Sequence, residues 1–164
     1  MAEIALTRGY VAIVDEADLE LVGSHKWSAH SSGYAVRMES GRMVYMHRLI
    51  MNATGAVYVD HINGDVRDNR RSNLRLCSGN QSAMNRGKVK RSTSSRYKGV
   101  WYQSKTMRWH AHIRIPVPGK GRGRRKFLGS FGSEIEAARA YNEAALMYHG
   151  TFARLNEIQE DVCR

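Results

Sequence analysis

The chain has 164 residues and a formal net charge of +11 at pH 7. The charge is uneven: residues 1–50 carry 5 Lys/Arg against 6 Asp/Glu, whereas residues 95–131 carry ten basic residues and no acidic one. This gradient favours a polyanionic partner over a merely soluble basic protein. It disfavours a membrane surface, because no amphipathic helix carries the basic residues. Two distant cysteines, Cys77 and Cys163, exclude a zinc ribbon and a disulfide scaffold.

The N-terminus, MAEIALTRGY, lacks the basic-then-apolar profile of a secretory signal. No apolar run approaches the roughly 20 residues that a bilayer-spanning helix needs. We therefore expect a soluble, intracellular protein that is not secreted.

The first 45 residues predict mostly short strands. Residues 4–14 favour two β segments around Arg8-Gly9, and residues 15–27 favour a short amphipathic helix. Residues 33–38 and 42–51 indicate paired strands around a turn at Ser40-Gly41, the second able to run into a helix. The histidines of this region are interpreted as ordinary surface or packing residues, except His47. The sequence leaves open whether His47 is structural or contacts phosphate.

The stretch VDHINGDVRDNRRSNLR, residues 59–75, concentrates groups that can act on a phosphodiester. Asp60 is a hard oxygen ligand suited to Mg²⁺ or Mn²⁺, and His61 can accept a proton near neutral pH. Arg70 and Arg71 add positive charge that can contact DNA. Adjacent strand residues point to opposite faces, so the Asp–His pair meets one substrate only if the chain twists there. The stretch suits an enzyme that cuts phosphodiesters.

The secondary structure expected around this stretch is strand, loop, strand, helix. The strands are residues 57–62 and 73–77. Ser78 stands three positions before Gln81, a capping-box spacing that starts a helix over about 79–87.

The pattern D-H-x-N-G…D-N-R-x-x-N-L-R…N-R is similar to the HNH endonuclease family, whose ββα-metal core occurs in phage and intron homing nucleases. The resemblance covers roughly residues 46–86. It implies that His61 is the general base and that Asp60 binds one divalent metal. It also implies that Asn73 ties the two strands together and orients the base.

One position departs from that family. The metal site is usually completed by an Asn or His on the helix, nine residues past the central Asn, and here that position is Ser82. Asn80 and Asn85 flank it, and Asn85 matches the family's trailing Asn-Arg. Three outcomes stay open: Ser82 binds through a water, a neighbouring Asn substitutes, or metal affinity and activity are reduced.

A basic linker, RGKVKRSTSS, follows at residues 86–95. Its Lys88, Lys90 and Arg91 can lie along a DNA backbone, and a solvated tether is equally acceptable. Three strand-like segments then precede a helix that Ser133 and Glu136 open with a second capping box and that runs to about residue 148. The apolar residues on this helix at helical spacing are expected to be core: Ala137, Ala138, Tyr141, Ala144, Ala145 and Tyr148.

Such a three-stranded sheet, backed by one helix, leaves its other face open to a major groove. The residues expected on the open face are large, basic or polar: Trp101, Gln103, Lys105, His112, Arg114, Arg125 and Phe127. We also expect Lys98 to contact DNA.

The run Y-K-G-V…W-H-A-H-I-R…F-L-G-S-F…E-A-A-R-A-Y-N-E-A-A…H-G…A-R-L-N resembles the plant ethylene-response-factor (Apetala-type) DNA-binding domain over residues 95–156. The resemblance implies base contacts from the open-face residues. Only Arg114 and Arg125 keep the arginines of the plant pattern, whereas Trp101 and Gln103 replace two of them. The plant target sequence is therefore not carried over.

Together these features predict an α+β chain in which a ββα-metal nuclease core precedes a small sheet packed on one helix. The expected divisions are a lead-in (1–45), the HNH core (46–88), a linker (89–94), the DNA-binding domain (95–156) and a tail (157–164).

The expected function is a metal-dependent DNA endonuclease that uses Mg²⁺ or Mn²⁺ and is a site-specific nicking or homing enzyme. The expected partner is double-stranded DNA, bound by a monomer or a DNA-assembled dimer in the cytoplasm of a bacterial or phage-infected cell. The alternative is a sequence-specific DNA-binding regulator whose nuclease core is weak or silent.

Overall fold

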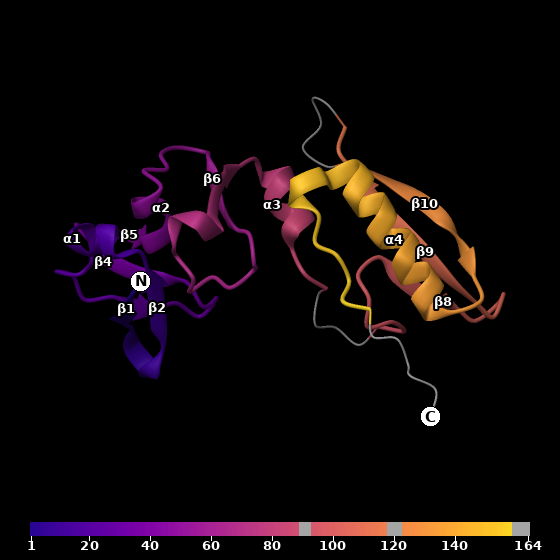
Figure 1. Cartoon of the computed structure of the whole chain (residues 1–164), viewed down its shortest axis with the longest axis horizontal. Coiled ribbons are helices and arrows are strands. Elements are labelled where there is room, and N and C mark those ends of the chain that lie inside the picture. The colour runs from indigo at the N-terminus through magenta and orange to yellow at the C-terminus, as the bar shows by residue number, and fades with distance from the viewer. Residues whose placement is uncertain (89–92, 118–122, 159–164) are drawn as a thin grey trace. The chain divides into compact units, whose positions relative to one another are not determined.

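The computed structural model of the chain describes residues 1–88, 93–117 and 123–158 (Figure 1). The chain divides into two compact units, Met1–Ser82 and Ala83–Arg164, and its described residues form small antiparallel sheets and few helices. Lys90 and Arg91, which were predicted to contact DNA, lie outside the described residues. Within the described part, no helix is both long and apolar enough to cross a membrane.

The first unit begins with an antiparallel hairpin. β1 (Ala2–Ala5) pairs with β2 (Val11–Val14), and η1 (Thr7–Gly9) lies between them. Arg8 and Gly9 have positive φ angles of 64° and 72°, and these left-handed conformations help the chain to reverse direction. The prediction of two short strands around Arg8-Gly9 is confirmed.

A short helical segment follows the hairpin. The predicted amphipathic helix is split into η2 (Glu16–Asp18) and a single turn, α1 (Leu19–Val22). The buried Trp27 donates a hydrogen bond from its indole Nε1 to the carbonyl of Val22 at 2.9 Å. This bond satisfies one of the carbonyls left open at the end of the helix.

The next sheet has the strand order β3-β4-β5, with β3 at Ser28–Ala29, β4 at Ala35–Glu39 and β5 at Arg42–Tyr45. Ser40 and Gly41 form the two-residue connection between β4 and β5, with φ angles of 48° and 76°. Positive φ at both positions is the requirement of a type I′ hairpin turn. The predicted strand pair around this turn is confirmed.

A single apolar core holds the first unit together. β5 is followed directly by α2 (Met46–Ile50), a continuation into a helix that the sequence had allowed. Buried side chains of the hairpin, α1, the sheet and α2 pack into this core, and so do Val59 and Leu74. Those two residues belong to the next pair of strands, so the core fixes that pair in place.

That pair is the segment richest in candidate chemistry. β6 (Tyr58–His61) runs antiparallel to β7 (Leu74–Cys77), and α3 (Gly79–Asn85) follows. The Ser78 N–H donates to Gln81 Oε1 at 2.8 Å, and the Gln81 N–H donates to Ser78 Oγ at 3.3 Å. The predicted capping box and the order strand, loop, strand, helix are both confirmed.

The second unit is one sheet backed by one helix. β8 (Val100–Gln103), β9 (Arg108–Ile115) and β10 (Arg124–Phe131) form a sheet of order β10-β9-β8. α4 (Glu134–His149) lies across one face of it, and η4 (Gly150–Phe152) follows (Figure 1). The predicted three-stranded sheet with a helical backing is confirmed.

α4 begins with the predicted capping box, in which Ser133 Oγ accepts from the Glu136 N–H at 3.1 Å. The helix residues predicted to be core are buried, apart from Tyr148, which is half-buried. Gly99 lies just before β8 with φ of 78°, and a Cβ at this position would stand 2.2 Å from the Tyr141 ring. Only glycine therefore lets the chain approach α4 this closely.

Candidate functional site

The first candidate site lies on β6, where Asp60 and His61 are both buried, with 8% and 4% of their surface exposed. Asp60 is directly across the sheet from Arg75. Arg75 donates to Asp60 Oδ2 from Nε at 2.9 Å and from Nη2 at 2.7 Å. This pairing compensates the buried negative charge, which would otherwise be costly.

His61 is enclosed by other side chains. Its Nε2 lies 3.3 Å from Asn69 Oδ1, within hydrogen-bonding distance. Its ring centroid is 5.8 Å from that of Tyr34 and 5.1 Å from that of His47. Burial lowers the pKa of His61 from its ordinary value of 6.5, and the Asn69 contact and nearby carboxylates, Asp60 first among them, offset this only in part. The imidazole is therefore neutral at neutral pH, as a proton acceptor has to be.

His47, which the sequence left undecided, packs against His61. It is 7% exposed, and its ring centroid lies 4.9 Å from that of Tyr34 and 5.6 Å from that of Tyr45. Burial lowers the pKa of His47 to about 3, with smaller electrostatic contributions from His61 and Arg48. His47 thus forms a neutral wall of the site rather than a cationic group.

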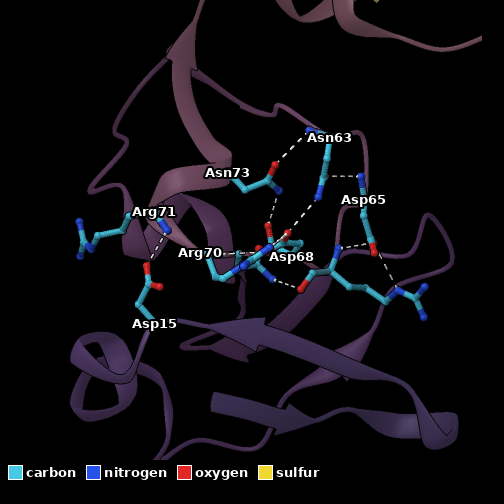
Figure 2. Close-up of polar contacts among 9 residues, drawn as sticks. Asp15, Asn63, Asp65, Asp68, Arg70, Arg71 and Asn73 are labelled. Atoms are coloured by element: carbon cyan, nitrogen blue, oxygen red, sulfur yellow. Dashed lines mark hydrogen bonds and ion pairs between the residues drawn. The ribbon is translucent and has the colours of Figure 1, made fainter. Parts of the chain in front are cut away.

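Asn73 closes the loop between the two strands, as Figure 2 shows. Its Nδ2 donates to the Asp68 carbonyl at 2.7 Å, and its Oδ1 accepts from the Asn63 N–H at 3.0 Å. The side chain of Asp68 accepts from Asn63 Nδ2 at 2.9 Å in the same cluster. Asn73 therefore binds the loop that surrounds His61. Asn69, whose side chain lies within hydrogen-bonding distance of the His61 ring, was not singled out by the sequence.

Arg70 and Arg71, predicted to contact DNA, are already engaged in ion pairs. Arg70 donates to the two carboxylate oxygens of Asp68 at 2.8 and 2.6 Å. Arg71 makes three contacts of 2.6 to 3.1 Å with the buried carboxylate of Asp18. Its backbone N–H donates to Asp15 Oδ2 at 2.8 Å (Figure 2). Both arginines thus anchor the loop, and the acidic partners that lie more than 50 positions away could not be identified from the sequence.

The predicted helix ligands lie on α3. Ser82 and Asn80 are half-buried and Asn85 is buried. In the described residues, no group of three His, Cys, Asp or Glu side chains is arranged to hold a metal ion. Mg²⁺ needs few protein ligands, since it keeps several waters and is held by one or two carboxylates together with substrate phosphates. The buried carboxylate of Asp60 fits such an ion, in competition with Arg75.

The second candidate site is the sheet face turned away from α4. Trp101 lies at the centre of an aromatic cluster, with its ring centroid 5.1 Å from that of His110, 4.9 Å from His112 and 6.4 Å from Phe127. Arg125 stacks 5.1 Å from the Trp101 centroid, and its Nη2 lies 3.1 Å from His112 Nδ1. The face therefore carries one guanidinium held in a defined orientation.

Burial and neighbouring cations together set the charge of His112 on this face. Burial first, and then the charges of Arg125, Lys88 and Arg114, lower the pKa of His112 to about 4. His112 is therefore neutral and can accept a hydrogen bond from Arg125. Phe127 is 55% exposed, so the cluster presents an apolar surface beside the guanidinium.

Four of the predicted contact residues come together in this cluster: Trp101, His112, Arg125 and Phe127. Three others lie outside this cluster. Arg114 donates from Nη1 to the carbonyl of Gly123 at 3.0 Å, Lys105 is exposed in the turn after β8, and Gln103 ends β8.

Lys98 is half-buried, and its Nζ donates to the carbonyl of Met84 at 2.5 Å. Burial lowers the pKa of Lys98 to about 8, and the charges of Arg154 and Arg86 add to this effect.

Arg108 and His110 also belong to the open face, although neither was predicted there. β9 alternates strictly, so that residues 108, 110, 112 and 114 share one face while Ala111 and Ile113 are buried against α4. Extending the period of two backward from His112 would have identified both residues.

A family model described as HNH endonuclease matches residues 44–84, and one described as AP2 domain matches residues 95–151. Over 157 residues the chain is 31% identical to an uncharacterized HNH endonuclease of Acanthamoeba polyphaga mimivirus, a match that covers 92% of this chain and 77% of that protein.

The C-terminal part is similar to plant proteins. It is 48% identical over 60 residues to the dehydration-responsive element-binding protein 2A of Oryza sativa subsp. indica, covering 37% of this chain and 20% of that protein. It is 39% identical over 66 residues to the APETALA2-like protein 2 of the same subspecies, covering 40% of this chain and 14% of that protein. No solved structure matches the chain significantly. The chain therefore belongs to the HNH endonuclease family and carries an AP2 domain in its C-terminal part.

Proposed function

We propose that the chain is a divalent-metal-dependent DNA endonuclease that hydrolyses phosphodiesters at sites recognised by its AP2 domain. The observation that carries the proposal is the buried pair on β6: a neutral imidazole, His61, next to a carboxylate, Asp60, in a chain of the HNH endonuclease family. A nicking or homing role is the form of this activity that the family resemblance favours.

In the proposed mechanism, His61 takes a proton from a water molecule that attacks the phosphorus atom. Arg75 holds the Asp60 carboxylate in a fixed position on the neighbouring strand. Asp60 would hold a divalent cation, which would supply stabilisation of the negative charge on the phosphate and the leaving oxygen. One such centre per chain favours cleavage of a single strand, unless two copies assemble on DNA.

DNA recognition is assigned to the aromatic and basic face of the β8–β10 sheet. Arg125 is stacked on Trp101, so little of its conformational freedom is left to be lost on binding. A guanidinium in this state can form two hydrogen bonds with guanine O6 and N7 in the major groove, while Phe127 can contact a thymine methyl. The basic residues of 95–131 supply contacts to the phosphate backbone.

A DNA-binding regulator with a weak or silent nuclease core is the second candidate. It is favoured by Ser82, which stands where the family usually has an amide or imidazole ligand. It is also favoured by the Asp60–Arg75 ion pair, which competes with a metal for the carboxylate.

Replacing His61 by alanine should reduce nicking of supercoiled plasmid by about 10²- to 10⁴-fold, because the general base is lost. Binding to the same plasmid should be unchanged, as followed by gel shift without metal. His25→Ala removes an exposed histidine of the same unit and should leave both readouts intact. Nicking that survives in the His61 variant would show that another group is the base.

The pH dependence of cleavage should follow the lowered pKa of His61. A base must be deprotonated to act, and a lowered pKa extends the deprotonated form to more acidic solution. The acidic limb of a plot of kcat/KM against pH is therefore expected below 6.5. A limb at or above pH 6.5 would contradict the assignment.

Replacing Ser82 by asparagine should lower the Mg²⁺ concentration at half-maximal cleavage, roughly tenfold, since an amide oxygen is a better metal ligand than a hydroxyl. Ala83→Asn places the same side chain at the next, exposed position of α3 and serves as the control. Equal metal dependence in the wild type and both variants would exclude residue 82 from the metal site.

Replacing Arg125 by alanine should weaken binding to the preferred DNA site by about 10- to 100-fold and relax the preferred sequence, because one bidentate base contact is lost. Selection of bound sequences from a random pool, at fixed salt, measures both effects. Arg139→Ala removes an arginine from the exposed surface of α4 and should keep the preferred sequence. An unchanged sequence preference in both variants would show that the sheet face does not read bases.

A further inference from the structure

Asn69 is a polar residue with none of its surface exposed, and the proposed mechanism gives it no role. Its backbone and side-chain polar groups contact three different residues. Its backbone N–H donates to the carbonyl of Ile13 at 2.7 Å, its Nδ2 donates to the carbonyl of Arg67 at 3.0 Å, and its Oδ1 faces His61 Nε2 at 3.3 Å.

These contacts fix which way round the amide lies. A backbone carbonyl can only accept a hydrogen bond, so the amide nitrogen of Asn69 has to face Arg67. The opposite orientation would set two oxygen acceptors against each other in a buried site. The oxygen of the amide is therefore the atom that faces the His61 ring.

The amide in turn fixes the proton on the imidazole. Oδ1 has no hydrogen, so the bond to His61 exists only if Nε2 carries one. A neutral imidazole has a single N–H, and its other nitrogen then holds the basic lone pair.

We propose that Asn69 is a positioning residue that holds His61 as the Nε2–H tautomer, so that Nδ1 is the atom that takes the proton from water. This inference rests on the proposed function, in which His61 is the base. In the step, one O–H bond of water breaks, an Nδ1–H bond forms, and the resulting imidazolium keeps its Nε2–H bond to Asn69.

The N-terminal hairpin holds Asn69 in place. Ile13 lies on β2, and its N–H donates to the carbonyl of Arg67 at 2.9 Å, in addition to the bond that its carbonyl accepts from Asn69. This pair of bonds forms a short parallel bridge between β2 and the loop. Asn73 supports the same loop from the other side, through the carbonyl of Asp68. Asn73 was predicted to orient the base. Its hydrogen bond holds Asp68, the residue directly before Asn69, so its effect on the orientation of His61 is exerted through Asn69.

The tautomer of His61 can be measured directly on the full chain. Long-range ¹H–¹⁵N correlation spectra at pH 8 distinguish the two neutral forms, and the His61→Ala variant identifies the signal. The wild type should show the Nε2–H form. Asn69→Ala should show a mixture or the Nδ1–H form, and kcat should fall by about 10- to 100-fold at unchanged KM. Asn69→Asp loses the hydrogen bond to the Arg67 carbonyl but keeps the acceptor that faces His61, so it should retain the Nε2–H form.

Asp18→Asn is the matched control for general damage to the loop. It weakens the ion pair that anchors Arg71 but leaves the Asn69 amide intact, so the melting temperature should fall while the His61 signal keeps its pattern. An Nδ1–H signal in the wild type, or an unchanged signal in Asn69→Ala, would overturn the inference.

The spectra do not depend on cleavage, so the inference and the proposed function can fail separately. A tautomer change in Asn69→Ala, in a wild-type protein that does not nick DNA, would support the role of Asn69 and reject the nuclease. Nicking that needs His61, together with an unchanged tautomer in Asn69→Ala, would do the reverse.

Discussion

The first unit depends on the hydrogen bonding of one buried polar loop. Asp68, Asn69 and Asn73 lie between β6 and β7 with at most 7% of their surface exposed. Buried polar groups are costly unless they are paired, so this loop is stable only because backbone and side-chain atoms of several segments meet its donors and acceptors. β2, Asp15 and Asp18 supply the partners that lie farthest away in the sequence. The first 18 residues therefore contribute directly to the geometry around His61.

Burial also sets the charge of the candidate site. His47 and His61 lie against each other, and the surrounding side chains remove both from water, which keeps both rings neutral. Asp60 accepts two hydrogen bonds from Arg75 on the neighbouring strand. The candidate site therefore combines a neutral imidazole with a carboxylate whose charge Arg75 compensates.

In the second unit, the alternation of side chains along the strands places core residues on one face of the sheet and the residues assigned to DNA recognition on the other. One side of β9 carries Ala111 and Ile113 against α4, and the other carries His110 and His112 in contact with Trp101. The aromatic rings on the open side support Arg125 and leave Phe127 exposed. The two-residue alternation of side chains along β9 thus supplies both the core and the surface that is assigned to DNA binding.

The sequence by itself determined the elements whose signals are local. The strand periodicity, the Ser40-Gly41 turn, the two capping boxes and the alanine-rich face of α4 each depend on residues a few positions apart, so they could be read directly. The Asp60–His61 pair could also be identified, because its chemistry is carried by adjacent residues.

Tertiary structure decided which groups surround that pair. From the sequence, Arg70 and Arg71 were expected to be available for DNA. In the fold, Arg70 forms an ion pair with Asp68 and Arg71 forms one with Asp18. Asn69 was identified as a neighbour of the candidate base only because the fold places its side chain against His61. His47 was identified in the same way, because its ring packs against that of His61. These contacts join segments that are distant in the chain. Every buried polar group needs a partner, and only the folded structure shows which partner each one has.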